Sequence, residues 1–267
     1  MIIKKSRDEI ERMARAGRLV AQAHEEVAAA LRPGMTTLDL DVIAERVIRG
    51  AGATPSFKGY RGFPATLCTS PNDQIVHGIP AKETVLGEGD VLSIDCGAVV
   101  DGFHGDSAVT LIVGGDDATT PEIAELVRAT RRALWRGLEQ VRDGQRIGDI
   151  GHAVEAVAVE HGYGVVREYV GHGIGRALHE DPSVPNYGRA GTGMRMSPGW
   201  VIAVEPMFNL GGEETRALDD GWTVVTADGS VSAHWEHTVA LTPEGPWVLT
   251  ARSDEPAWPL DAPAPAW

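Results

Sequence analysis

The sequence predicts an α+β domain in which a central antiparallel sheet is backed by helices and the two halves of the chain are related by a pseudo-twofold repeat. Two observations lead to this fold class. In each half, two helical segments precede a run of strands. In each half, the strands also carry two acidic residues among apolar neighbours, first Asp95 and Asp106, then Glu205 and Glu236.

Two helices are predicted at the start of the chain. The first covers about residues 6–31, because Ser6 and Glu9 match a capping box and apolar residues follow at helical spacing. The second covers about residues 37–50 and ends at a pair of glycines. We expect both to form an outer layer.

A β-hairpin is predicted at the centre of the chain. An apolar run leads into Asp95, the pair Asp101-Gly102 signals a turn, and residues 109–113 read as the returning strand. The hairpin would bring Asp95 and Asp106 side by side. Two carboxylates buried together repel each other and lose hydration, and a bound divalent cation would compensate. The alternative is two exposed aspartates that flank a turn.

The second half repeats the pattern. A helix begins with Pro121 at its first position and runs to about residue 141, and another covers about residues 149–161. Strands are predicted over 165–170, 201–205, 222–227 and 233–241. Residues 253–267 are rich in Pro, Ala and Asp, so we expect a poorly ordered surface tail after a single catalytic domain of residues 1–252.

Composition excludes several classes of protein. The chain has 24 Lys and Arg against 38 Asp and Glu, a formal net charge of −14, which argues against dedicated nucleic-acid binding. The two cysteines give no disulfide framework or zinc knuckle. No secretory signal follows Met1, and no apolar run is long enough to cross a bilayer. We therefore expect a cytoplasmic protein that does not bind membranes.

Hard oxygen ligands together with one imidazole suit a site for two divalent ions such as Mn, Fe(II), Co or Zn. The candidates are Asp95, Asp106, His172, Glu205 and Glu236. Each alone has an ordinary interpretation as a solvated strand residue. Together, acids at three strands and one histidine between glycines are difficult to explain as solvated surface. The pattern Gly171-x-Gly173-x-Gly175 near His172 does not have the spacing of a dinucleotide-binding loop, so we reject nucleotide binding.

From about residue 3 to 250, the chain resembles the type I methionine aminopeptidases, metalloenzymes that remove the initiator methionine. The motifs that carry the resemblance are Cys68-Thr69-Ser70 with Asn72, Val76-His77-Gly78-Ile79-Pro80, Ile94-Asp95, Asp101-Gly102-Phe103-His104-Gly105-Asp106, Gly171-His172-Gly173-Ile174-Gly175 with His179-Glu180, Glu205-Pro206-Met207 and Trp235-Glu236-His237-Thr238. Their order and spacing all agree with the family. The resemblance implies the pita-bread fold with its pseudo-twofold symmetry.

The resemblance also implies a role for each residue. Asp95 would chelate one ion, Asp106 and Glu236 would bridge two, and His172 and Glu205 would complete the site, with Co, Mn, Fe(II), Zn or Ni able to occupy it. A bridging hydroxide would attack the first peptide bond when the second residue is small. Catalytic roles fall to Glu205 as the proton-handling group, His179 at the oxyanion and His77 near the scissile amide. The methionine slot would be lined by Phe57, Tyr60, Phe63, Cys68, Leu178 and Trp222.

Partners follow from the resemblance in the same way. The substrates would be nascent polypeptides that begin with Met, a transient ribosome contact is compatible with that role, and the family expectation is a monomer. Two other functions remain open. A proline-specific peptidase on the same fold would prefer an Xaa-Pro bond, and a non-enzymatic binding protein would turn over no peptide with any divalent metal.

Overall fold

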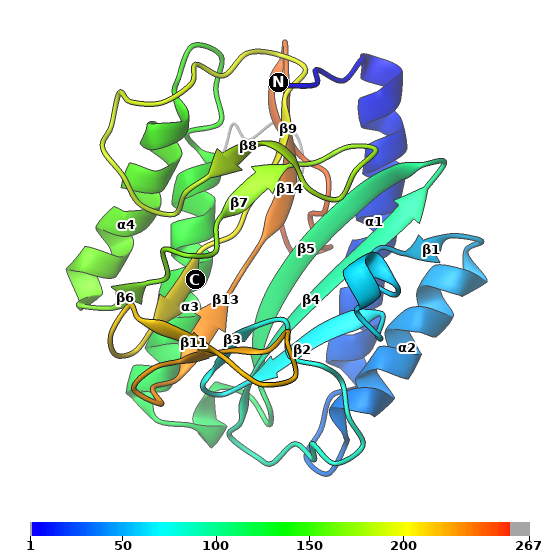
Figure 1. Ribbon diagram of the computed structural model, residues 1–267, viewed down its shortest axis with the longest axis vertical. Coiled ribbons are helices and arrows are strands. Elements are labelled where there is room, and N and C mark those ends of the chain that lie inside the picture. The colour runs from blue at the N-terminus through cyan, green and yellow to red at the C-terminus, as the bar shows by residue number, and fades with distance from the viewer. Residues whose placement is uncertain (1, 257–267) are drawn as a thin grey trace.

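The computed structural model describes residues 2–256 (Figure 1). Its α-helices are α1 (Arg7–Ala30), α2 (Thr37–Gly50), α3 (Pro121–Leu138) and α4 (Ile147–His161), and its 3-10 turns are η1 (Tyr60–Gly62) and η2 (Asp116–Ala118). The predicted capping box at α1 is present, because Ser6 Oγ accepts from the Glu9 backbone N–H while the Glu9 carboxylate accepts from Ser6 N–H. All four helices lie where the sequence predicts them.

The first half of the chain forms a sheet in the order β1-β4-β2, with β5 paired to β4. Its strands are β1 (Thr54–Pro55), β2 (Leu67–Pro71), β4 (Val91–Val100) and β5 (Phe103–Ile112). The second half forms a sheet in the order β15-β14-β9-β7-β8. Its strands are β7 (Gly171–Gly173), β8 (Glu180–Val184), β9 (Val201–Val204), β14 (His237–Thr242) and β15 (Gly245–Val248).

Two smaller sheets have the orders β13-β10-β6 and β11-β12-β3, and the second of them joins the halves because β3 pairs with β12. Their strands are β3 (Gln74–Val76), β6 (Gly164–Val165), β10 (Met207–Asn209), β11 (Thr215–Ala217), β12 (Val224–Thr226) and β13 (Ser232–His234). The strand pairings in all four sheets are antiparallel. The predicted central antiparallel sheet is therefore confirmed, and it is divided into four segments.

The predicted hairpin is β4–β5. Its register pairs Asp95 with Ala108 and Gly97 with Asp106, so the two aspartates are diagonal neighbours on one face of the hairpin. The other face packs on α1. At this contact a Cβ on Gly105 would lie 2.6 Å from the backbone nitrogen of Gly17, so the helix can approach the strand this closely only because residue 105 is glycine.

The helices cover the sheets on the outside (Figure 1). Helices α1 and α2 lie beside the strands of the first half, and α3 and α4 lie beside those of the second. One apolar core of buried residues runs between the helices and the sheets through both halves. The helices therefore leave the opposite face of the sheets free to form a site. No helix of the described chain is long and apolar enough to cross a membrane.

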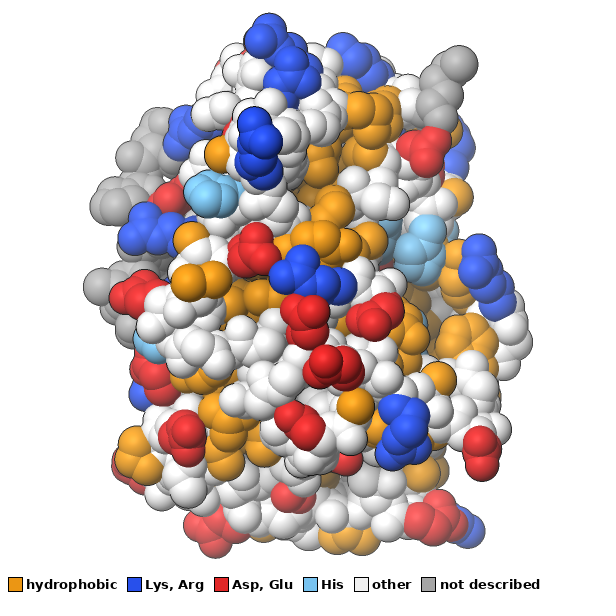
Figure 2. Space-filling model, turned by 60° about the vertical axis from the view of Figure 1, so that its left-hand side comes forward, with side chains coloured by type: hydrophobic (Ala, Val, Ile, Leu, Met, Phe, Trp, Pro, Cys, Tyr) orange, Lys and Arg blue, Asp and Glu red, His pale blue; other side chains and the backbone are white. Residues whose placement is uncertain are grey.

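Charged side chains are unevenly distributed on one face of the molecule (Figure 2). Acidic side chains are spread over its middle and lower part, while Lys and Arg gather chiefly near its top. This face carries no continuous basic surface of the kind that phosphate backbones require.

Only the first four residues of the predicted tail, 253–256, are among the described residues. Residues 257–267 lie outside the described residues. Residues 253–256 belong to the fold, because the side chain of Glu255 is fully buried against His237 and Ser253 N–H donates to Glu25 Oε1 at 2.8 Å. The expectation of a loose tail does not hold for these four residues, and the domain boundary at 252 stays a prediction.

Candidate metal and peptide-binding site

The five candidate ligands converge from separate elements on one cavity of about 410 Å³. Asp95 lies on β4 and Asp106 on β5, at the diagonal positions that the hairpin register gives them. His172 lies on β7. Glu205 follows β9 directly, and Glu236 lies in the short connection between β13 and β14. The cavity therefore lies where the two halves of the fold meet.

The ligand atoms of this cluster are close together. Nε2 of His172 is 3.5 Å from Oε1 of Glu205 and 3.9 Å from Oδ2 of Asp106. Ligand atoms of Asp106, His172 and Glu236 all lie within 4.8 Å of one another. Side chains at these separations can share a cation.

Burial makes the cluster costly without a cation. Asp106 and Glu236 are only 4% and 2% exposed, and Asp95 and Glu205 open only partly to the cavity. One oxygen each of Asp95, Asp106 and Glu236 is buried without a hydrogen-bond partner. Buried polar atoms normally have partners, so these oxygens need an explanation. Carboxylate oxygens with one imidazole are a donor set that fits divalent ions.

The pKa values of the acids reflect the same crowding. Burial raises the pKa of Asp95 to about 7. Burial also raises the pKa values of Asp106, Glu205 and Glu236, and neighbouring carboxylates raise them further. The four carboxylates are therefore more stable when they share protons or bind cations than when all four are ionised and unpaired.

The histidines of the cavity are neutral at pH 7. Burial lowers the pKa of His172 to about 3 and that of His77 to about 4. Partial burial, with help from the Arg61 charge, lowers the pKa of His179, which stands at the cavity mouth. His77 has a backbone φ of 62°, a left-handed conformation that is uncommon for a residue with a side chain. Strained backbone of this kind is concentrated at functional sites.

The six residues predicted to line an apolar slot all face the same cavity. The rings of Phe63 and Trp222 meet edge to face, with centroids 5.1 Å apart. The Cys68 thiol stays neutral, because burial raises its pKa well above the usual value. The slot members are Phe57, Tyr60, Phe63, Cys68, Leu178 and Trp222.

Sequence reasoning missed His234. Its ring is buried, and its Nε2 lies 3.7 Å from Oε2 of Glu205 and has no hydrogen-bond partner. Burial lowers its pKa to about 3. A signal was available, because residues two apart in an extended segment share a face, and His234 lies two residues before Glu236. Tyr169 also lines the cavity and was not predicted; its ring centroid is 5.7 Å from that of His77.

Comparison with known proteins gives consistent results. Residues 11–243 match the model of metallopeptidase family M24. The chain is 48% identical over 250 residues to a methionine aminopeptidase of Clostridium acetobutylicum, covering 94% of this chain and 99% of that one. It is 49% identical over 256 residues to methionine aminopeptidase 1 of Mycobacterium tuberculosis, covering 94% and 95%.

Solved structures show the same fold. The crystal structure of methionine aminopeptidase from Thermotoga maritima has a TM-score of 0.91 at 44% identity, covering 94% of this chain and all of that one. The Xaa-Pro dipeptidase from Bacillus anthracis has a TM-score of 0.72 at 24% identity, and this chain covers 62% of its length. The second likeness concerns the fold alone, and the predicted pita-bread class is confirmed by both.

Proposed function

The chain belongs to metallopeptidase family M24 and removes N-terminal methionine in a metal-dependent hydrolysis, and we propose that the cavity between the two halves is where this reaction takes place. One observation carries the proposal: four carboxylates and an imidazole, distant in sequence, line a single cavity beside an apolar slot. The slot suits the methionine side chain, because apolar walls exclude water and accommodate an unbranched thioether.

We propose two divalent ions, drawn from Co, Mn, Fe(II), Zn or Ni, as the cofactor. Asp95, Asp106, His172, Glu205 and Glu236 would hold them, and the unpartnered oxygens support this donor set. When bound, such ions supply Lewis acidity and water of lowered pKa. Asp106 and Glu236, the two most buried of these four acids, would be ligands to both ions, as the family resemblance implies.

The other residues act on the peptide itself. Glu205 accepts a proton from the attacking water and returns it to the departing amine, so that the C–N bond breaks with proton balance. His179 at the cavity mouth donates a hydrogen bond to the carbonyl oxygen as it gains charge. His77 contacts the amide on the side of the leaving amine.

Selectivity follows from the walls of the cavity. The family resemblance implies an aromatic residue at the position that Leu178 occupies in this chain, so we expect a slot slightly roomier than usual around the methionine methyl group. The rings of Tyr169 and Trp222 flank His77 at centroid distances of 5.7 and 6.3 Å and narrow the cavity there. We propose that this narrowing limits the second residue of the substrate to small side chains.

The setting of the reaction is also a proposal. We infer that the protein works as a cytoplasmic monomer on nascent polypeptides that begin with Met. Any ribosome contact would be transient, because the net charge of −14 gives no general attraction to RNA.

The test is a tripeptide panel with metal analysis on the same sample. We expect hydrolysis of Met-Ala-Ser with Mn²⁺ or Co²⁺ and much slower hydrolysis of Leu-Ala-Ser and Ala-Pro-Ala. Preferred cleavage of Ala-Pro-Ala would support the proline-specific alternative. Absence of turnover with every divalent metal would support a binding protein instead.

A further inference from the structure

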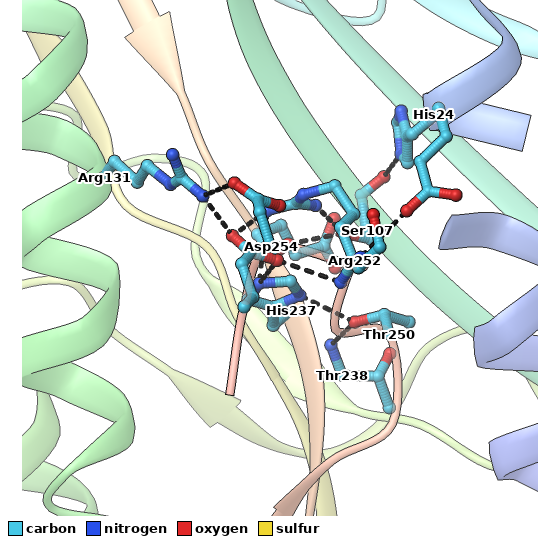
Figure 3. A network of polar contacts seen from close by, with 12 residues as sticks. His24, Ser107, Arg131, His237, Thr238, Thr250, Arg252 and Asp254 are labelled. Carbon is cyan, nitrogen blue, oxygen red and sulfur yellow. Dashed lines mark hydrogen bonds and ion pairs between the residues drawn. The ribbon is translucent and has the colours of Figure 1, made fainter. Parts of the chain in front are cut away.

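Polar side chains of the last described segment, among them Thr250 and Arg252, form a network of contacts with Ser107, Arg131 and His237 (Figure 3). Thr250, Arg252 and Glu255, here named the C-terminal clamp, are almost fully buried, with 0% and 9% exposure for the first two and a fully buried side chain for Glu255. Buried ionised groups are costly unless they are paired and hydrogen-bonded. The clamp therefore requires specific partners, and its partners lie next to the candidate ligands in sequence.

Strand alternation explains this proximity. Asp106 and Glu236 face the cavity, so the adjacent Ser107 and His237 face the opposite side. Nη1 of Arg252 donates to Oγ of Ser107 at 3.4 Å, and Nη2 lies 3.2 Å from Nε2 of His237. One guanidinium thus contacts the sequence neighbours of both carboxylates.

The other two clamp residues add to this contact. Oγ1 of Thr250 accepts from Thr238 N–H at 3.1 Å and lies 2.8 Å from Nδ1 of His237. The carboxylate of Glu255 accepts from Arg252 Nη2 at 2.7 Å and from Arg131 on α3 at 2.8 Å. The clamp therefore connects β5, β14 and α3.

The clamp spans the contact between β5 and β14, where few backbone hydrogen bonds connect the two strands. Within residues 2–256, β5 and β14 belong to different sheets. Near the site they are connected mainly by side chains: Thr238 Oγ1 donates to Asp106 O at 2.8 Å, and Ser107 Oγ donates to Glu236 O at 2.6 Å. A backbone bond from Glu236 N–H to Ala108 O at 3.0 Å completes the contact.

We propose that Arg252, supported by Thr250 and Glu255, is a positioning residue that fixes the separation of Asp106 and Glu236 by holding Ser107 and His237 from the far side. The inference rests on the proposed function, in which these two carboxylates share ions. Shared ligands must be held within about 0.5 Å of their productive geometry. The match to family M24 ends at residue 243, before the clamp, and does not account for it.

The test is a calorimetric titration of Mn²⁺ into the chelator-treated full chain. Mutation of residues that hold metal ligands in place typically lowers metal affinity about 10–100-fold. We expect Arg252→Met to weaken Mn²⁺ binding within that range, and Arg252→Lys, which keeps the charge but loses the forked geometry, to recover part of it. The control is Ile48→Ala in α2, which truncates a fully buried side chain away from the site and should lower the urea midpoint without changing Mn²⁺ affinity.

Four results would overturn the positioning role of Arg252 or the proposed function. Arg252→Met with unchanged Mn²⁺ affinity but a lowered urea midpoint, like Ile48→Ala, would make the clamp a structural element only and overturn the inference. If Arg252→Met does not fold, the same titration is made on Thr250→Val, which replaces one hydroxyl with a methyl group, and an unchanged Mn²⁺ affinity in that variant would overturn the inference. A wild-type chain that binds no Mn²⁺ would overturn the proposed function and the clamp's role with it. Mn²⁺ binding and Met-Ala-Ser hydrolysis that persist in every variant would overturn the clamp's role alone.

Discussion

The hydroxyl of Tyr60 lies 2.9 Å from Nδ1 of His179. The two rings are also in contact, with centroids 5.5 Å apart. A neutral imidazole has one N–H, and a partner on one nitrogen selects which nitrogen carries it. If Tyr60 donates to Nδ1, the hydrogen of His179 is on Nε2, the nitrogen available to the substrate.

Tyr60→Phe is therefore expected to lower kcat by about 5-fold while KM for Met-Ala-Ser and metal content stay near wild type, since a hydrogen bond is worth roughly 1 kcal/mol. Steady-state kinetics and metal analysis measure this. Tyr163→Phe is the control, because Tyr163 stacks on His161 away from the cavity. An unchanged kcat in Tyr60→Phe would mean that the contact does not orient His179.

His179→Ala should separate catalysis from metal binding. Loss of a donor to the developing oxyanion typically costs about 10²-fold or more in kcat. His179 is not among the candidate ligands, so its variant should keep near-normal metal content. Metal analysis of the same preparation checks this. Loss of metal in parallel with activity would show that His179 is a ligand and that its assigned role is wrong.

Asp106→Ala should act on metal binding itself. The carboxylate is only 4% exposed and lies with His172 and Glu236 inside a 4.8 Å cluster. We expect a lowered metal-to-protein ratio and loss of hydrolysis at any practical Mn²⁺ concentration. Elemental analysis after dialysis measures the ratio. A variant that retains two equivalents would contradict the shared position given to Asp106.

Glu255 gives a prediction about pH. Burial opposes ionisation of Glu255, but hydrogen bonds from His237 and Arg252 and the charge of Arg252 outweigh it and hold the pKa of Glu255 below the ordinary 4.5. The unfolded state then binds more protons than the folded state at low pH, so this carboxylate stabilises the fold above about pH 4.5 and loses that contribution as pH falls. The unfolding free energy of the wild-type chain should exceed that of Glu255→Gln at pH 7, and the difference should shrink towards pH 3. Urea titrations of metal-free protein at both pH values measure it. A difference that does not depend on pH would contradict the ionised pairing.

The main elements could be predicted because their signals are local. Ser6 with Glu9 marks the start of α1, and Asp101-Gly102 marks the hairpin turn that sets Asp95 and Asp106 on one face. Acids inside apolar strands are rare enough to indicate a site. Residue type and setting made His172 and Glu236 candidate ligands, and the family resemblance gave each its place beside those acids, since no local pattern specifies that contact.

The clamp was not predictable for a physical reason. Arg252 and Glu255 stand in a polar, Pro-rich stretch whose composition is typical of exposed chain. Their burial depends on partners about fifteen to 150 residues distant, such as His237 and Ser107, and no periodicity encodes those contacts. His234 carries a weaker signal, because a single histidine two residues before Glu236 is more often an ordinary core residue than part of a site.

Anomalous X-ray diffraction from crystals soaked with Mn²⁺ tests the central claim most directly. The account predicts anomalous density inside the cavity, within bonding distance of Asp95, Asp106, His172, Glu205 and Glu236. Density only at surface sites, or ions held by fewer than three of these side chains, would contradict it.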